Sequence, residues 1–111
     1  MEPTFSTEVQ KSDGVTLIHV QGEIDMETAE RLRDAIEPHL GPDQKIVLDF
    51  SGVEFMDSSC LKVLVQARGS LTADGGSLVL RNPSAIARRV LDATGLQDLL
   101  DEDAQDNPPS E

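Results

Sequence analysis

The sequence predicts a single α/β domain: a mixed sheet of four or five strands with its helices packed mainly on one face. Two apolar segments, 5–10 and 15–21, flank a Ser-Asp-Gly turn signal at 12–14, which indicates an antiparallel hairpin. Two later apolar runs, 45–50 and 77–81, are each followed by a segment with helical spacing, which is typical of parallel strands joined by helices. A length of 111 residues suits one such domain.

The first helix is predicted directly after the hairpin. The segment 22–25 leaves the sheet, and Asp25 can cap the helix, because its carboxylate accepts from free N–H groups of the first turn. Pro38 ends or kinks this helix near Glu37, since proline has no N–H to donate. The apolar face of the helix comprises Ala29, Leu32, Ile36 and Leu40.

The segment 45–61 is the most informative part of the chain. It starts as an apolar strand of the kind that is buried on both faces, and it then crosses a Ser-Gly loop at 51–52. Asp57 is a good N-cap for the following helix, which places Ser58 and Ser59 in its first turn, where free N–H groups point outward and the dipole is positive. The predicted apolar face of this helix comprises Leu61, Leu64, Val65 and Ala67, with Val63 on its flank.

The last elements are a strand over 77–81 and a third helix that opens at Asn82-Pro83. Gly95 ends this helix, because glycine readily adopts the left-handed conformation of a C-terminal cap. The segment 96–100 is a candidate for a last edge strand.

Composition limits the possible functions. The formal net charge of −12 makes nucleic acid and anionic membrane surfaces poor partners. No apolar run approaches a membrane span and no signal-peptide pattern is present, so we expect a cytoplasmic protein. The single cysteine excludes an internal disulfide. Residues 101–111 carry five acidic and no basic side chains, and we expect a disordered acidic tail after a domain spanning 1–100.

The sequence carries no recognisable catalytic motif. It lacks a Gly-x-Ser-x-Gly elbow, a P-loop, a dinucleotide fingerprint and His-rich metal spacing. His19 falls within a predicted strand and His39 at a helix end, so Ser58 has no evident base to activate it. We therefore expect a protein that is not an enzyme and that holds no metal or cofactor.

Three motifs follow one another along the chain. They read Gly22-Glu23-Ile24-Asp25, then Asp49-Phe50-Ser51-Gly52 with Asp57-Ser58-Ser59-Cys60-Leu61, and finally Thr94-Gly95-Leu96. In this order they resemble the STAS domain, the sulfate transporter and anti-sigma factor antagonist family, and above all its small free-standing antagonists. The resemblance covers nearly the whole chain. The family usually has glycine where this chain has Cys60.

The resemblance implies a regulatory binding module of a stress response. Its unphosphorylated form would bind an anti-sigma factor that is also a serine kinase, and would thereby release a sigma factor for transcription. Ser58 would be the phosphorylated residue, with ATP and Mg²⁺ supplied by the kinase; a serine phosphatase is a further candidate partner, and we expect a monomer or weak dimer. The expected contact surface comprises Gly22, Asp25, Asp57, Ser59, Cys60 and Leu61.

Two alternatives remain open. Within the same fold, the chain could be a STAS subunit of a stress-sensing complex or of a lipid transporter. From another class, it could be a thiol redox sensor, because a helix start favours the thiolate of Cys60, although the carboxylate of Asp57 opposes this. The simpler interpretation, which we favour, is that Cys60 is a small packed residue. Ser58 and Ser59 likewise could serve only as helix caps.

Overall fold

The protein, seen in a computed structural model that describes residues 5–100, is built around one four-stranded sheet. Its strands are β1 (Phe5–Ser12), β2 (Val15–Ile24), β3 (Lys45–Met56) and β4 (Ser77–Arg81), in the spatial order β1-β2-β3-β4. β1 and β2 form the predicted antiparallel hairpin, whereas β2, β3 and β4 are parallel neighbours. The hairpin turn consists of Asp13 and Gly14, whose φ angles of 45° and 80° are those of a type I′ turn.

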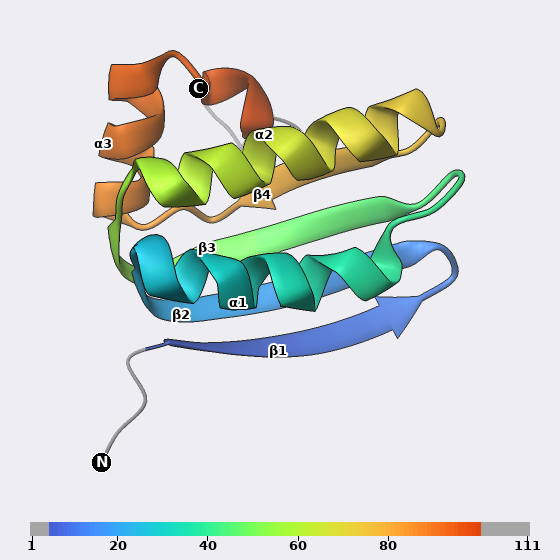
Figure 1. The fold of residues 1–111 in the computed structure, drawn as a ribbon, viewed down its shortest axis with the longest axis horizontal. Coiled ribbons are helices and arrows are strands. Elements are labelled where there is room, and N and C mark those ends of the chain that lie inside the picture. The colour runs from blue at the N-terminus through green and yellow to red at the C-terminus, as the bar shows by residue number, and fades with distance from the viewer. Residues whose placement is uncertain (1–4, 101–111) are drawn as a thin grey trace, which may run out of the picture.

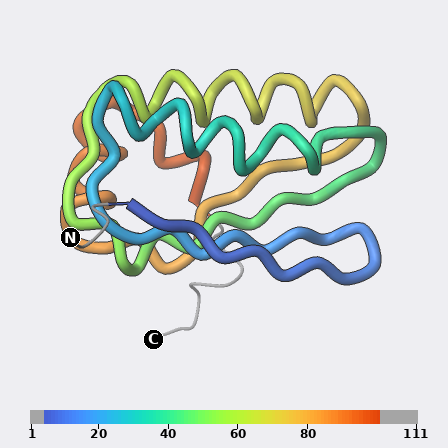
Figure 2. Tube along the Cα trace, turned by 60° about the horizontal axis from the view of Figure 1, so that its bottom comes forward, coloured from blue at the N-terminus to red at the C-terminus, as the bar shows by residue number. Residues whose placement is uncertain are grey.

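The helices of the described residues are α1 (Met26–Ile36), α2 (Ser58–Ala73) and α3 (Ala85–Thr94), with short 3₁₀ helices η1 (Glu37–His39) and η2 (Gln97–Leu99). α1 and α2 lie side by side over one face of the sheet (Figures 1 and 2). α3 follows β4 and packs against β3, and the N–H of its N-cap Ser84 donates to the Phe50 carbonyl in the middle of β3 at 3.2 Å. The predicted mixed sheet with helices mainly on one face is confirmed.

The hydrophobic core lies between the sheet and its covering helices. Buried and more exposed residues alternate along β2, so Ile18 and Val20 face the helices while His19 points to the opposite face. β3 is buried on both faces over residues 46–50, as the sequence predicts, and Leu48 and Phe50 belong to the core. The largest fully buried side chains are Ile18, Ile24, Leu32, Ile36, Ile46, Leu48, Phe50, Leu64, Leu71, Leu80, Leu91 and Leu99.

β2 and β3 both extend further than the sequence predicts. The expectations that 22–25 leaves the sheet and that 51–52 forms a loop are wrong, because the two strands stay paired as far as Ile24 and Met56. The pairing shifts register twice, between His19 and Gln21 and between Gly22 and Glu23, each time with one extra residue in β3, and Gly22 lies at the second shift with a φ of 102°. Long-range pairing therefore overrides the local turn preference of the Ser-Gly pair.

The buried face of α2 differs from the predicted face. Val63 is 4% exposed and belongs to the core, whereas Val65 is 43% exposed. Val63 lies three residues after Cys60 and four before Ala67, and both of these are buried, so all three share one side of the helix. The prediction that placed Val65 on the apolar face is therefore wrong.

α3 begins later than predicted and ends as predicted. Its N-cap is Ser84, whose hydroxyl accepts from the Ala87 N–H at 3.2 Å, so Pro83 precedes the cap instead of opening the helix. At the other end Gly95 adopts a left-handed φ of 74°. The Leu96 N–H then donates to the Leu91 carbonyl at 2.9 Å, which closes the last turn.

Residues 96–100 do not form the candidate edge strand. They contain η2 instead, and Leu100 makes one isolated parallel bridge to Leu80. Leu99 is fully buried, so side-chain packing holds this segment. The prediction of an acidic tail over 101–111 lies outside the described residues. Within 5–100, no helix is both long and apolar enough to cross a membrane.

Candidate functional site

The predicted site residues gather at the end of the sheet where β2 and β3 finish. α1 and α2 both begin there, directly after the two parallel strands (Figure 1). The Asp57 N–H donates to the Ile24 carbonyl at 3.2 Å and so ties the two helix starts together. The carboxyl ends of parallel strands are the usual place for binding in α/β folds.

Asp57 caps α2, as the sequence predicts. Its backbone is extended, and its carboxylate accepts from the Ser59 N–H at 2.8 Å. Ser58 is the first residue of the helix and is exposed, while Ser59 is half-buried. The hydroxyl of Ser58 is therefore accessible, and any charge added to it would lie beside the carboxylate that already occupies the N–H of Ser59.

Asp25 caps α1 through a more complete set of bonds. Its carboxylate accepts from the N–H groups of Glu27 and Thr28 at 3.0 and 2.9 Å. The Thr28 hydroxyl accepts from the Asp25 N–H at 2.8 Å and lies 2.8 Å from the Glu23 carbonyl, to which it donates. The bond from the Thr28 N–H lowers the pKa of Asp25 most, and the other hydrogen bonds to this carboxylate lower it further. Desolvation opposes them, but the pKa remains below its ordinary value.

Gly22 contributes backbone geometry to this end of the sheet. It is half-buried within β2, and its φ of 102° lies in the region that favours glycine. The adjoining register shift between Gly22 and Glu23 lets β2 follow β3 to its end. Its structural role is therefore to bring Glu23 and Asp25 into position.

Cys60 and Leu61 face inward, which corrects the expectation that they line a contact surface. Cys60 is fully buried and Leu61 is 9% exposed. Burial, followed by the nearby charge of Asp57, raises the pKa of the Cys60 thiol to about 12. A buried, protonated thiol is a poor nucleophile, so its environment favours the interpretation of Cys60 as a packed residue over that of a redox sensor.

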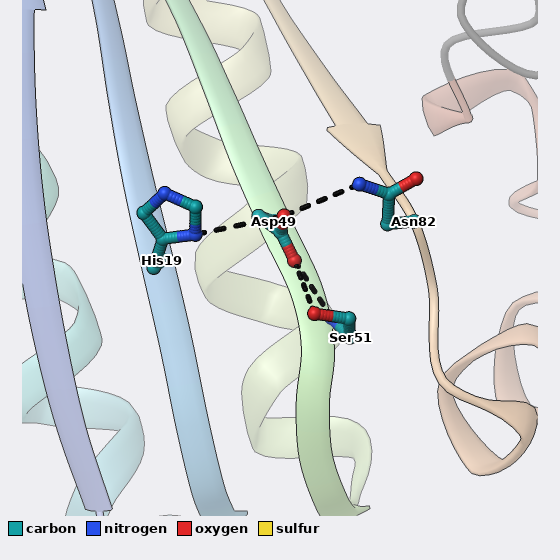
Figure 3. Close-up of polar contacts among 4 residues, drawn as sticks. All are labelled: His19, Asp49, Ser51 and Asn82. Carbon is teal, nitrogen blue, oxygen red and sulfur yellow. Dashed lines mark hydrogen bonds and ion pairs between the residues drawn. The ribbon is translucent and has the colours of Figure 1, made fainter.

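The other half of the central motif forms a polar cluster on the sheet face that points away from α1 and α2 (Figure 3). Asp49 lies at its centre and accepts from the N–H and hydroxyl of Ser51 at 2.9 and 2.7 Å. The Asn82 amide donates to the second carboxylate oxygen at 3.3 Å, and His19 Nδ1 lies 3.5 Å from the same oxygen. The cluster thus links β2, β3 and the turn that follows β4.

This cluster does not have the arrangement of a catalytic triad. The Ser51 hydroxyl donates to Asp49 and not to His19, so no base is placed to activate the serine. Partial burial raises the pKa of Asp49, but the bonds from Ser51 and Asn82 and the charge of His19 outweigh it, so this pKa lies below its ordinary value. The arrangement is that of a structural clamp around an ionised carboxylate.

Comparison with known proteins identifies the family. The model of the STAS domain family matches residues 6–107. The chain belongs to the STAS domain family. An anti-sigma-B factor antagonist of Bacillus subtilis (strain 168) is 34% identical over 99 residues, which cover 87% of this chain and 89% of that protein.

Solved structures agree with this assignment. The anti-sigma factor antagonist SpoIIAA in its unphosphorylated form is 26% identical, covers 86% of each chain and has a TM-score of 0.76. The Bacillus cell fate determinant SpoIIAA in the phosphorylated form is 24% identical, covers 86% of this chain and 89% of that chain, and has a TM-score of 0.67. The second likeness supports the fold alone.

The sequence pattern did not reveal two exposed apolar residues at the Ser58 end of this STAS domain. Met26, the first residue of α1, is 76% exposed, and Phe55, near the end of β3, is 46% exposed. A helix start usually favours polar residues, and Phe55 lies between the predicted Ser-Gly loop at 51–52 and the predicted helix cap at Asp57. An apolar side chain at a polar junction is the signal that could have identified both.

Proposed function

We propose that this STAS domain is an anti-sigma factor antagonist that is switched off by phosphorylation of Ser58. The unphosphorylated form binds an anti-sigma factor with serine kinase activity and thereby frees a sigma factor for transcription. The curated relative from Bacillus subtilis, which matches over nearly its full length, is itself named an antagonist of anti-sigma-B factor. SpoIIAA, a structural neighbour with 26% identity, is likewise named an anti-sigma factor antagonist and is described in its unphosphorylated form.

The observation that carries the proposal is the exposed hydroxyl of Ser58 at the first position of α2. A kinase must reach the hydroxyl with its own catalytic groups, and an exposed residue at a helix start meets that need. Ser59 is less suitable, because it is half-buried and its N–H is bonded to Asp57. Ser58 is therefore the preferred acceptor of the two.

The proposed role of the chain in the transfer is limited to supplying this hydroxyl. His19 is engaged with Asp49 on the sheet, and His39 lies beyond the opposite end of α1. Neither is placed to take a proton from Ser58. ATP, Mg²⁺ and the catalytic base would come from the kinase, as in phosphoryl transfer by protein kinases generally. A serine phosphatase would reset the switch.

The phosphate would act on the interface and leave the fold intact. It adds a charge of about −1.5 to −2 at pH 7. Asp57 and exposed Glu54 are its near neighbours along the chain, so the new charge makes an acidic surface more acidic. A partner docked on this surface would lose affinity through like-charge crowding and desolvation.

The proposal is tested by incubating the chain with anti-sigma factor kinases of its own organism and ATP, and then mapping the phosphate. We expect one phosphate, on Ser58, and none in Ser58→Ala. Ser58→Asp should bind the kinase about 5- to 150-fold more weakly, which corresponds to about 1–3 kcal/mol. Circular dichroism should be unchanged in both variants.

Ser59→Ala is the matched control, because it removes the neighbouring hydroxyl and should still be phosphorylated. Phosphate mapped to Ser59, or equal affinity of the wild type and the phosphorylated form, would exclude the switch at Ser58. Recovery of a transporter ATPase or a large sensory complex in place of an anti-sigma kinase would assign the domain to a different assembly.

A further inference from the structure

Exposed apolar side chains are unevenly placed on this molecule. Among the described residues, the large exposed ones are Val9, Val15, Met26, Phe55 and Val65. Val9 and Val15 belong to the β1–β2 hairpin, and Val65 lies in the middle of α2. Met26 and Phe55 instead lie at the two junctions that surround Ser58, and Met26 is the most exposed of the five. A single exposed apolar residue is normal on a protein surface, so what distinguishes Met26 and Phe55 is that both lie at the end of the sheet where Ser58 is exposed.

The pairing of β2 with β3 places Phe55 and Met26 at the same end of the sheet as Ser58. Phe55 is aligned with Glu23 on β2, three residues before Met26. Two residues after Phe55, the Asp57 N–H bonds to the Ile24 carbonyl, and Ser58 follows at once. Met26 and Ser58 are each the first residue of their helices, so they occupy equivalent positions at neighbouring helix starts.

The two junction segments that contain Met26 and Phe55 carry charge of one sign. The two junction segments, 22–28 and 53–59, contain five acidic and no basic residues. Three of these acidic residues, Glu23, Glu27 and Glu54, are exposed. The other two are the partly exposed cap residues Asp25 and Asp57. Such a surface repels nucleic acid and anionic membranes and favours a protein with basic groups. The apolar side chains within it require apolar pockets on the same partner.

We propose that Met26 and Phe55 are the two apolar anchors by which this chain holds its anti-sigma factor. This inference rests on the proposed function and adds the chemistry of the partner, which is a surface with two apolar pockets set among lysine or arginine side chains. Large side chains that fill pockets carry most of the affinity of an interface, while surrounding charges mainly set the association rate. The anchors therefore act on dissociation, and Glu23, Glu27 and Glu54 on association.

The two roles are separable by experiment. The anti-sigma kinase that phosphorylates wild-type chain serves as the probe, and surface plasmon resonance measures both rates. We expect Phe55→Ser and Met26→Ser each to raise the dissociation rate at least about tenfold. Val65→Ser is the matched control, since Val65 is 43% exposed and Phe55 46%, and it should leave both rates unchanged. Glu54→Gln should lower the association rate and its salt dependence.

Each result decides one question. All variants should keep the wild-type circular dichroism spectrum and melting temperature, because both replaced side chains are exposed; Phe55→Gln provides a second substitution if Phe55→Ser is unstable. Unchanged dissociation rates in folded variants at both positions would overturn the anchor proposal while leaving the antagonist function intact. Failure of wild-type chain to bind any anti-sigma kinase would overturn the proposed function, and the anchors with it.

Discussion

The junction of β2 with α1 and the junction of β3 with α2 have the same backbone conformation, but their side chains form different hydrogen bonds. Each helix is capped by an aspartate in an extended conformation, with φ and ψ of −112° and −167° at Asp25 and of −123° and −169° at Asp57. Both aspartates accept from the N–H two residues later, at 3.0 and 2.8 Å. The two helix starts therefore have the same cap conformation and the same first cap hydrogen bond.

The two helix starts differ at the third residue of the helix. In α1 this residue is Thr28, which is buried and whose hydroxyl closes a capping box with Asp25. In α2 it is Cys60, which is fully buried and points into the core. The first junction is thus closed by hydrogen bonds within itself, whereas the second leaves the exposed hydroxyl of Ser58 at its surface. The same kind of cap thus belongs to a closed junction in one case and to a junction with an accessible hydroxyl in the other.

The largest effect that tests this contrast is the reactivity of Cys60. Because burial raises the pKa of its thiol to about 12, we expect alkylation of the folded protein at pH 8 to be at least about 100-fold slower than that of a small thiol. The unfolded chain in guanidinium chloride should react at the ordinary rate. Fast alkylation of the folded protein would mean that the second junction is a redox site after all.

The next effect concerns the packing of the same residue. A position in the first turn alone predicts that Cys60→Gly costs about 1 kcal/mol or less. Full burial adds the loss of a packed side chain, so we expect the free energy of unfolding to fall by about 2 kcal/mol. Urea unfolding measures it, and Ser59→Gly, at a half-buried neighbour, should cost less.

Measuring partner binding by Cys60→Gly distinguishes an effect on stability from an effect on function. Cys60 does not reach the surface, so folded Cys60→Gly should bind its partner as wild type does. Loss of binding without loss of fold would show that Cys60 acts at the interface and that the second junction depends on it directly.

The sequence predicts the elements of this fold whose signals are local. Asp25 and Asp57 as caps, the Asp-Gly hairpin turn and Gly95 as a helix end each depend on one or two residues and their own backbone. The exposed Ser58 at the start of α2 follows from the cap at Asp57 in the same way. These features could therefore be predicted together with the family resemblance.

Features that depend on pairing between distant segments could not be predicted. The Ser51-Gly52 pair reads as a loop until β2 is known to run alongside it. The contact of His19 with Asp49 requires the register of two parallel strands, which the sequence does not state. The burial of Cys60 depends on how α2 lies on the sheet, and this also decides that a residue in a predicted contact surface belongs to the core.

A smaller effect tests the closure of the first junction. Thr28→Val keeps the shape of the side chain but removes the hydroxyl that bonds to Asp25 and to the Glu23 carbonyl. Because the site is buried, we expect the free energy of unfolding to fall by about 1–2 kcal/mol. Thr94→Val, whose hydroxyl bonds only to carbonyls at the exposed end of α3, should cost less. Equal costs would mean that the capping box adds nothing to the aspartate cap.

The smallest expected effect is the response of the first junction to acid. The pKa of Asp25 is lower in the folded protein than its ordinary value of 3.8, so the folded state holds the carboxylate ionised more strongly than the unfolded state does. This contribution to stability is fully present above the unfolded pKa, and it is lost as the pH falls through the lower folded pKa.

Unfolding should therefore bind protons below about pH 5, and Asp25 accounts for one proton at most. Asn is also a good N-cap, so Asp25→Asn should keep α1 while removing this proton and making the dependence of stability on pH between about 5 and 2 shallower. Urea titrations at a series of pH values measure this slope. An unchanged slope would mean that the bonds from Thr28 hold the cap equally well in its protonated form, and the first junction would then be closed by geometry alone and not by charge.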